Sequence, residues 1–180
     1  MTRTRTRLRS LGALITLALG ATLLAAAPAS ADAAGFTWPS DTDTSVEGLR
    51  STTLYVPGTT GDGTRCVVAT TLTAPDDVDA SHPAPAVIMG HGYSGNRGQL
   101  AAWAQFIAGQ GYVTLTFDAL GFGESTCQVG LDDPEYDGRV LRSLVDVLGG
   151  KPDAAFTDKD ATESAGTVDV VGDDELDPLG

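Results

Sequence analysis

Two short apolar runs, separated by a pattern with helical spacing, constrain the fold of this 180-residue chain more than any other feature. The runs occupy residues 86–89 and 112–117, and the apolar residues between them that recur at helical spacing are Leu100, Trp103, Phe106 and Ile107. A continuous apolar run is typical of a central strand that is buried on both faces. The order strand, helix, strand predicts a parallel pair joined by a right-handed crossover, and therefore the α/β class.

Further elements extend this unit in both directions. Residues 51–56 and 66–72 are rich in β-branched side chains, and the glycine-rich stretch 58–63 between them predicts a hairpin. Downstream, Asp133 is expected to cap a helix whose first residue is Pro134. Its apolar face would consist of Val140, Leu141, Leu144, Val145 and Leu148. Together these elements predict a mostly parallel sheet with flanking helices.

The first 31 residues have the layout of a secretory signal peptide. Residues 1–10 are basic without any acid, residues 11–27 are apolar, and small residues lead up to Ala31. An uncleaved membrane anchor is the alternative, but the run contains two glycines and is shorter than the roughly 20 residues that a membrane span needs. We expect cleavage after Ala31 and a secreted, extracellular protein without a stable membrane span.

The charge distribution excludes one class of partner and divides the rest of the chain. Eleven basic residues oppose 24 acidic ones, for a formal net charge of −13, and no basic cluster follows residue 10. Binding to a phosphate backbone requires such a cluster, so we expect no nucleic-acid partner. We assign residues 32–50 to a polar lead-in and 51–150 to the folded domain. Residues 151–180 form either an acidic surface loop or a disordered tail.

The chain has two cysteines, Cys66 and Cys127, and both belong to the exported part. An even pair in an oxidising compartment indicates one disulfide, although two free buried thiols remain the alternative. The cysteines are too far apart in sequence for a C-x-x-C motif, and only His82 and His91 are available as further ligands. We therefore predict neither a metal site nor a cofactor.

Three local patterns follow the predicted strands, where an α/β sheet presents its ligand-facing loops. The first is G-H-G-Y-S-G at residues 90–95, in which glycines let backbone N–H groups approach a bound oxygen. The second is D-A-L-G-F-G-E-S at residues 118–125, and the third is the stretch 128–136 that leads into the last helix. Their order along the chain carries more information than any one of them.

With these motifs in this order, residues 85–148 resemble the α/β-hydrolase superfamily. More narrowly, they resemble the secreted serine hydrolases of the X-Pro dipeptidyl-peptidase and cocaine-esterase group. The resemblance implies an α/β-hydrolase fold, present as its N-terminal half, and a small-molecule ester or peptide substrate. The runner-up within the fold is a secreted polyester or lipid esterase. A rival from another class is a non-catalytic secreted binding module.

The resemblance also assigns roles to residues. The backbone N–H of Tyr93, directly after His91 and Gly92, would form half of an oxyanion hole, and the Tyr93 hydroxyl is a second candidate donor. The alternative is that His91 and the glycines only make a tight turn. Asp118 and Ser125 would tie the second loop to the sheet. In this fold Cys66 would lie near the end of the strand 112–117, so a bridge to Cys127 is feasible.

The catalytic residues of such an enzyme are not found in this sequence. A serine hydrolase of this superfamily needs G-x-S-x-G, followed by an acid and then a histidine. The sequence has no such motif, and both histidines precede every plausible nucleophile. We therefore expect the chain to correspond to the N-terminal portion of a hydrolase, without nucleophile, acid or base, and to be inactive alone.

Overall fold

The computed structural model describes residue 36 and residues 38–171. The predicted signal peptide, residues 1–31, lies outside the described residues. The described residues belong to one compact unit. None of the helices in its described part has the length and apolar character needed to cross a bilayer.

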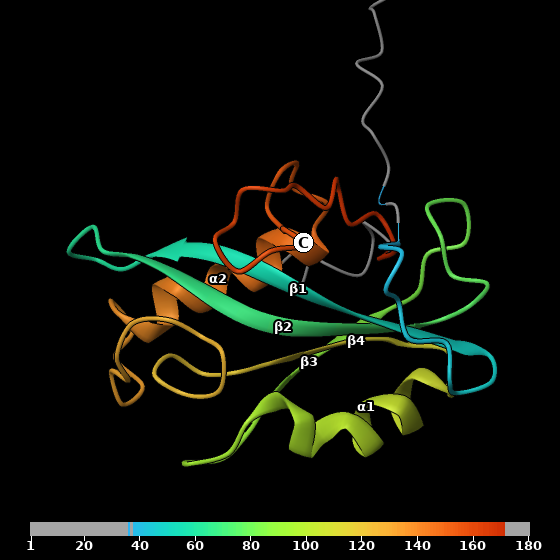
Figure 1. Cartoon of the computed structure of the whole chain (residues 1–180), viewed down its shortest axis with the longest axis horizontal. Coiled ribbons are helices and arrows are strands. Elements are labelled where there is room, and N and C mark those ends of the chain that lie inside the picture. Colours follow the sequence, from blue (N-terminus) through green and yellow to red (C-terminus); the bar gives the residue numbers. More distant parts are fainter. Residues whose placement is uncertain (1–35, 37, 172–180) are drawn as a thin grey trace, which may run out of the picture. The chain divides into compact units, whose positions relative to one another are not determined.

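The compact unit is a four-stranded sheet with helices against it (Figure 1). In chain order its elements are β1 (Leu49–Thr59), β2 (Arg65–Pro75), β3 (Ala86–Gly90), the short 3₁₀ helix η1 (Arg97–Leu100), α1 (Ala101–Ala108), β4 (Val113–Phe117) and α2 (Asp137–Leu148). The strand order is β1-β2-β4-β3. The α/β class is confirmed, and the described sheet is mixed, with one parallel pair and two antiparallel pairs.

The predicted hairpin is β1 and β2, which pair along their whole length from Leu49 opposite Pro75 to Thr59 opposite Arg65. Both strands are longer than the predicted segments, residues 51–56 and 66–72. Alternate residues of β1, including Leu54 and Val56, are fully buried, as expected for a strand with one face on the core. Strand β2 lies between β1 and β4, and both of its faces are buried along most of its length.

The predicted parallel pair is β3 and β4, joined through α1, with Ala86 opposite Val113 and Gly90 opposite Phe117. One part of that prediction is wrong for the described chain, because β3 lies at an edge of the sheet and not at its centre. Its residues are half-buried or exposed, and Ile88 retains 38% of its surface. The run is apolar enough for a central strand, but no described segment pairs with its outer edge.

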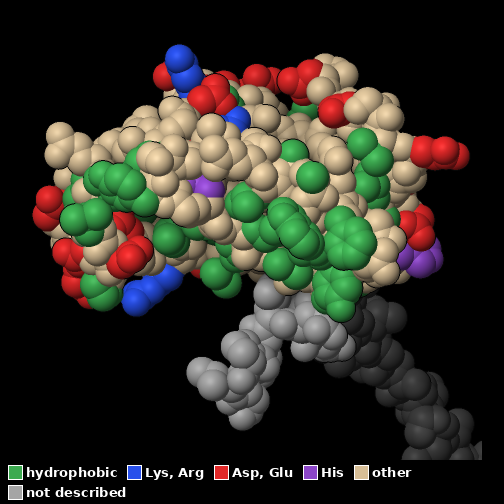
Figure 2. All heavy atoms as spheres, turned by 90° about the horizontal axis from the view of Figure 1, so that it is seen from below, with side chains coloured by type: hydrophobic (Ala, Val, Ile, Leu, Met, Phe, Trp, Pro, Cys, Tyr) green, Lys and Arg blue, Asp and Glu red, His purple; other side chains and the backbone are tan. Residues whose placement is uncertain are grey.

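Helix α1 turns its large apolar residues outward, contrary to the face expected from their spacing. The buried residues of α1 are Ala104 and Ala108, whereas Trp103 and Phe106 are 62% and 61% exposed. Two alanines let the helix lie close over β4 and β2, so the small side chains face the sheet. Figure 2 shows this side of the molecule, where hydrophobic side chains gather on the surface.

Helix α2 covers the opposite face of the sheet together with residues 151–171 (Figure 1). Val140, Leu144, Val147 and Leu148 are buried as a 3.6-residue periodicity requires, and Val145 is half exposed. A Cβ atom on Gly58 would lie 2.9 Å from both Val140 and Ser143, so a glycine in β1 lets the helix approach closely. The main hydrophobic core lies between α2 and the sheet.

The start of α2 differs from the prediction. The helix begins at Asp137 and its N-cap position is Tyr136, so neither Asp133 nor Pro134 starts it. Asp133 instead closes a preceding turn, in which its carboxylate accepts the Glu135 N–H at 2.8 Å and its carbonyl accepts the Tyr136 N–H at 3.1 Å. This local side-chain to backbone bond competes with helical pairing and delays the helix.

Residues 151–171 form an irregular segment that packs on the sheet. Phe156 pairs with Tyr55 on the free edge of β1, and the Ala84 N–H donates to the Val170 carbonyl at 3.1 Å. Val168, Val170 and Val171 are buried in the core. The rest of the acidic stretch, residues 172–180, lies outside the described residues.

Candidate functional site

The three sequence motifs meet around one cavity of about 360 Å³ at the carboxyl ends of β3 and β4. Its walls come from the loop after β3, the loop after β4, the segment before α2, and α2 itself. The lining residues are His91, Gly92, Tyr93, Phe117, Ala119, Leu120, Phe122, Val129, Leu131, Asp132, Asp137 and Leu141. This is the position at which α/β sheets bind ligands.

The loop after β3 is a tight turn. The Gly95 N–H donates to the Gly92 carbonyl at 3.0 Å, and Ser94 adopts a left-handed φ of 63° at the second central position. Gly95 is closely surrounded, because a Cβ atom there would lie 2.6 Å from the Gln99 side-chain oxygen and 3.0 Å from the Gly92 carbonyl oxygen. Gly92 and Tyr93 of this turn line the cavity.

Tyr93 presents its backbone N–H without an internal acceptor. Among the described residues, none accepts a hydrogen bond from this N–H. The side chain is 79% exposed, and its ring packs edge-to-face on Phe122 with centroids 5.4 Å apart. A free N–H group on a fixed turn is the type of donor that can stabilise a developing oxyanion.

His91 connects the two loops of the cavity. Its Nε2 accepts the Ala119 N–H at 3.0 Å, and its Nδ1 lies 2.7 Å from the Gly92 carbonyl oxygen. The ring also packs edge-to-face on Phe122, with centroids 5.5 Å apart. The two sequence-predicted residues His91 and Tyr93 therefore contact the same aromatic side chain.

Asp118 fixes the loop after β4 and is fully buried. Its carboxylate accepts the Arg97 N–H at 2.6 Å and the Glu124 N–H at 2.9 Å, and forms an ion pair with the Arg97 guanidinium. A buried carboxylate is stable only when it is paired and hydrogen-bonded in this way. The resemblance implies that Asp118 ties the loop to the sheet; its carboxylate instead binds Arg97 of η1 and Glu124 of the same loop.

Arg97 and Glu124 complete this cluster and were not predicted. The Arg97 guanidinium, 14% exposed, forms ion pairs with both Asp118 and Glu124. Burial alone would lower the pKa of Arg97, but the hydrogen bond to Glu124 and the charge of Asp118 outweigh it, and the pKa lies above its usual value. One signal was present in the sequence, since Arg97 is the only Lys or Arg between Arg65 and Arg139.

Ser125 and Thr126 continue the pairing of β2 after β4 has ended. The Ser125 hydroxyl accepts the Ala69 N–H at 2.9 Å and donates to the Asp118 carbonyl at 2.6 Å. The Thr126 hydroxyl accepts the Val67 N–H at 2.8 Å. The two hydroxyls take the place of the backbone carbonyls that a neighbouring strand would offer to β2. These contacts agree with the prediction that Ser125 ties the loop to the sheet.

The predicted disulfide is present directly after these two residues. Cys66 and Cys127 are bonded, with Cα atoms 5.7 Å apart and a sequence separation of 61. Cys66 is fully buried in β2, whereas Cys127 belongs to the cavity-lining loop and has a left-handed φ of 64°. The bond therefore attaches the site loop covalently to the sheet.

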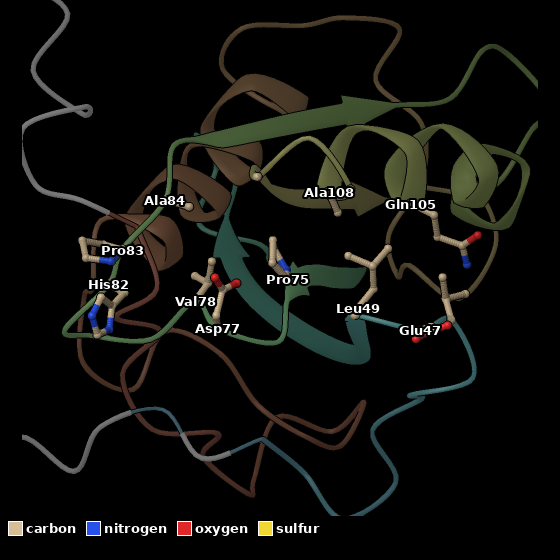
Figure 3. A pocket seen from close by; sticks show the side chains of 14 residues that line it. Glu47, Leu49, Pro75, Asp77, Val78, His82, Pro83, Ala84, Gln105 and Ala108 are labelled. Carbon is tan, nitrogen blue, oxygen red and sulfur yellow. The ribbon is translucent and has the colours of Figure 1, made fainter.

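A larger hollow of about 700 Å³ lies at the opposite ends of β3 and β4 (Figure 3). Glu47, Asp77 and His82 lie apart around it, and no described hydrogen bond joins their side chains. His82 is a solvated loop residue, with 79% of its side chain exposed. Within residues 38–171, no group of three His, Cys, Asp or Glu side chains is suited to a metal ion.

Several solved structures are similar to part of this chain. Three solved structures match with probability 1.00. One is a hypothetical protein from Pseudomonas aeruginosa, with 20% identity and a TM-score of 0.42; the match covers 57% of this chain and 32% of that one. The second is DcsB in complex with its substrate analogue, with 22% identity, a TM-score of 0.39, and coverage of 52% of this chain and 30% of that one. The third is acetyl xylan esterase 1 from Thermoanaerobacterium sp., with 20% identity, a TM-score of 0.38, and coverage of 57% of this chain and 34% of that one. The chain spans about a third of the length of each.

No curated protein matches the chain. The sequence profile of the family "Acetyl xylan esterase (AXE1)" matches residues 40–151, which is more than half of the chain and includes the loops after β3 and β4. The chain therefore belongs to the acetyl xylan esterase family.

Proposed function

We propose that this chain provides the acyl-binding and oxyanion part of a secreted serine esterase that removes acetyl groups from carbohydrate esters. The single observation that carries the proposal is the family match across residues 40–151. It favours an ester over a peptide bond next to proline, because the family is one of esterases.

In this proposal the Tyr93 N–H donates to the carbonyl oxygen of the bound ester. That oxygen gains negative charge when a serine attacks the carbonyl carbon, and a fixed N–H group stabilises the charge in the tetrahedral intermediate. The serine, its histidine and the acid come from residues outside this sequence, so the chain alone would not turn over substrate. Two observations support this role: no described group accepts a hydrogen bond from the Tyr93 N–H, and Tyr93 is one of the residues that line the cavity.

The chemistry of the cavity favours a small neutral acyl group. Its walls include the side chains of Phe117, Leu120 and Leu141, which suit a methyl group rather than a charged one. Asp132 and Asp137 also line it, and no Lys or Arg does, so anionic ligands would be repelled. An acetylated sugar fits both conditions. Export agrees with a polysaccharide substrate, and the disulfide agrees with export.

The proposal is tested by titrating the disulfide-bonded chain with a peracetylated xyloside and following backbone amide signals by NMR. We expect signals of Gly92, Tyr93, Ala119 and Phe122 to shift, and the unacetylated xyloside to leave them unchanged. Tyr93→Pro removes the donor at a turn position that accepts proline, and should weaken binding about two- to tenfold, the contribution of one neutral hydrogen bond. Tyr93→Phe keeps the N–H and is the matched control.

The remaining outcomes discriminate among the alternatives. Stronger shifts with a long-chain acyl ester would favour a lipid or polyester esterase, and shifts only with an X-Pro dipeptide would favour a peptidase. Binding of the unacetylated xyloside at another surface would favour a non-catalytic module. Hydrolysis of 4-nitrophenyl acetate, or labelling by a fluorophosphonate, with the chain alone would contradict our placement of the nucleophile outside it.

A further inference from the structure

Two hydrogen bonds select one tautomer of the His91 ring. The Ala119 N–H is a donor, so Nε2 must be the acceptor and carries no proton. The proton therefore lies on Nδ1, which donates to the Gly92 carbonyl oxygen at 2.7 Å. Only the neutral ring in this single tautomer makes both bonds.

The Gly92 carbonyl belongs to the same peptide unit as the Tyr93 N–H. A trans peptide is planar, and its C=O and N–H bonds point in opposite directions. The Gly92 oxygen accepts two hydrogen bonds, one from His91 Nδ1 and one from the Gly95 N–H at 3.0 Å. Because these bonds fix the direction of the carbonyl, they also fix the direction of the Tyr93 N–H.

The ring transmits this constraint from the loop after β4. Ala119 follows the fully buried Asp118, whose carboxylate is held by Arg97, so its N–H is a rigid reference point. Phe122, from the same loop, packs against the His91 ring on one side and the Tyr93 ring on another. The orientation of the Tyr93 N–H is therefore set by a loop to which Tyr93 does not belong.

From these contacts we propose that His91 is a positioning residue, which aims the Tyr93 N–H at the substrate oxygen. The proposal rests on the oxyanion role proposed above for that N–H. Both ring nitrogens are engaged in hydrogen bonds to the backbone, so His91 acts through the Gly92 peptide and not as an acid or base toward the ester.

Two substitutions separate positioning from simple structural support. His91→Asn places an amide N–H near the position of Nδ1, so it keeps the bond to Gly92 and loses the bond to Ala119. His91→Gln places an amide oxygen near the position of Nε2, so it keeps the bond to Ala119 and loses the bond to Gly92. Each variant loses one hydrogen bond, and we expect similar thermal unfolding midpoints for the two.

The decisive measurement is the backbone order parameter of the Tyr93 N–H, together with its residual dipolar coupling. We expect a rigid value of about 0.85 in the wild type and in His91→Asn, and a value below about 0.6 in His91→Gln. We also expect His91→Gln to weaken binding of the peracetylated xyloside by about the same factor as Tyr93→Pro, and clearly more than His91→Asn does.

Two results would overturn the proposal. One is an equal effect of both substitutions, or of neither, on the Tyr93 N–H vector. The other is a wild-type ¹⁵N spectrum in which His91 Nε2 carries the proton, a test that needs no variant. The order parameter is measured without ligand, so it tests the positioning role even if the acetyl ester does not bind and the proposed function fails.

Discussion

Substituting Gly123 by alanine tests the packing of the buried cluster around Asp118. Gly123 has a left-handed φ of 53°, and a Cβ atom there would lie 2.1 Å from one Asp118 carboxylate oxygen and 2.3 Å from its carboxyl carbon. Contacts this short force the carboxylate to move. The carboxylate would then lose its hydrogen bonds to Arg97 and Glu124.

Two effects contribute to the expected loss of stability. A left-handed backbone costs an alanine about 1–2 kcal/mol. Disrupting a buried ion pair costs about 3–5 kcal/mol, because an uncompensated charge remains in the interior. We therefore expect Gly123→Ala to lower the free energy of unfolding by about 4–7 kcal/mol, a large part of the roughly 5–15 kcal/mol typical of a domain.

The assay is urea unfolding of the disulfide-bonded chain, with Gly48→Ala as the matched control. Gly48 has a φ of 77° and no atom within 4 Å of its Cβ position, so it isolates the backbone effect of about 1–2 kcal/mol. In an Asp118→Ala background, where the obstacle is absent, Gly123→Ala should also cost only the backbone effect. Equal losses for Gly123→Ala and Gly48→Ala in the wild-type background would refute the reasoning.

Two further predictions concern the disulfide and one exposed acid. Replacing both Cys66 and Cys127 by alanine should lower the free energy of unfolding by about 4 kcal/mol, which is the chain-entropy value for a bridge across 61 residues. Urea unfolding measures this loss, and a loss below about 1 kcal/mol would contradict the prediction. Hydrogen bonds from the Ser81 hydroxyl and N–H lower the pKa of Asp79 from 3.8 to about 2. The contribution of the Asp79 carboxylate to the free energy of unfolding should therefore be complete above pH 3.8 and be lost as the pH falls through 2. A carboxyl ¹³C titration measures the pKa of Asp79. The difference in free energy of unfolding between the wild type and Asp79→Asn should vanish below pH 2. A difference that persists below pH 2 would contradict the prediction.

The parallel β3–β4 unit and the hairpin could be predicted because continuous apolar runs and β-branched runs are typical of strands that are buried in a sheet. The orientation of α1 could not, because four large apolar residues at helical spacing suggest a buried face. The helix instead buries Ala104 and Ala108, since small side chains permit the close approach. The start of α2 was missed because Asp133 has the residue type of a helix cap and closes a turn instead.

The sequence predicts that the G-H-G-Y and D-A-L-G motifs follow two strands, where ligand-facing loops lie. The structure places residues of both motifs around one cavity, and their connections could not be predicted. The ion pairs of Arg97 depend on side chains 21 and 27 residues away. The tautomer of His91 depends on the Ala119 N–H, a backbone group that residue identity does not reveal.

The hydroxyls of Ser125 and Thr126 make the pairing of β2 independent of the length of the stretch that follows Cys127. They pair with the Ala69 and Val67 N–H groups that a longer β4 would otherwise occupy, and the adjacent disulfide holds the chain there. Residues 128–136 begin only after these attachments and supply Val129, Leu131 and Asp132 to the cavity. Insertions or deletions in that stretch can therefore remodel one wall of the cavity while the sheet keeps its register, and evolution can change the ligand without rebuilding the fold.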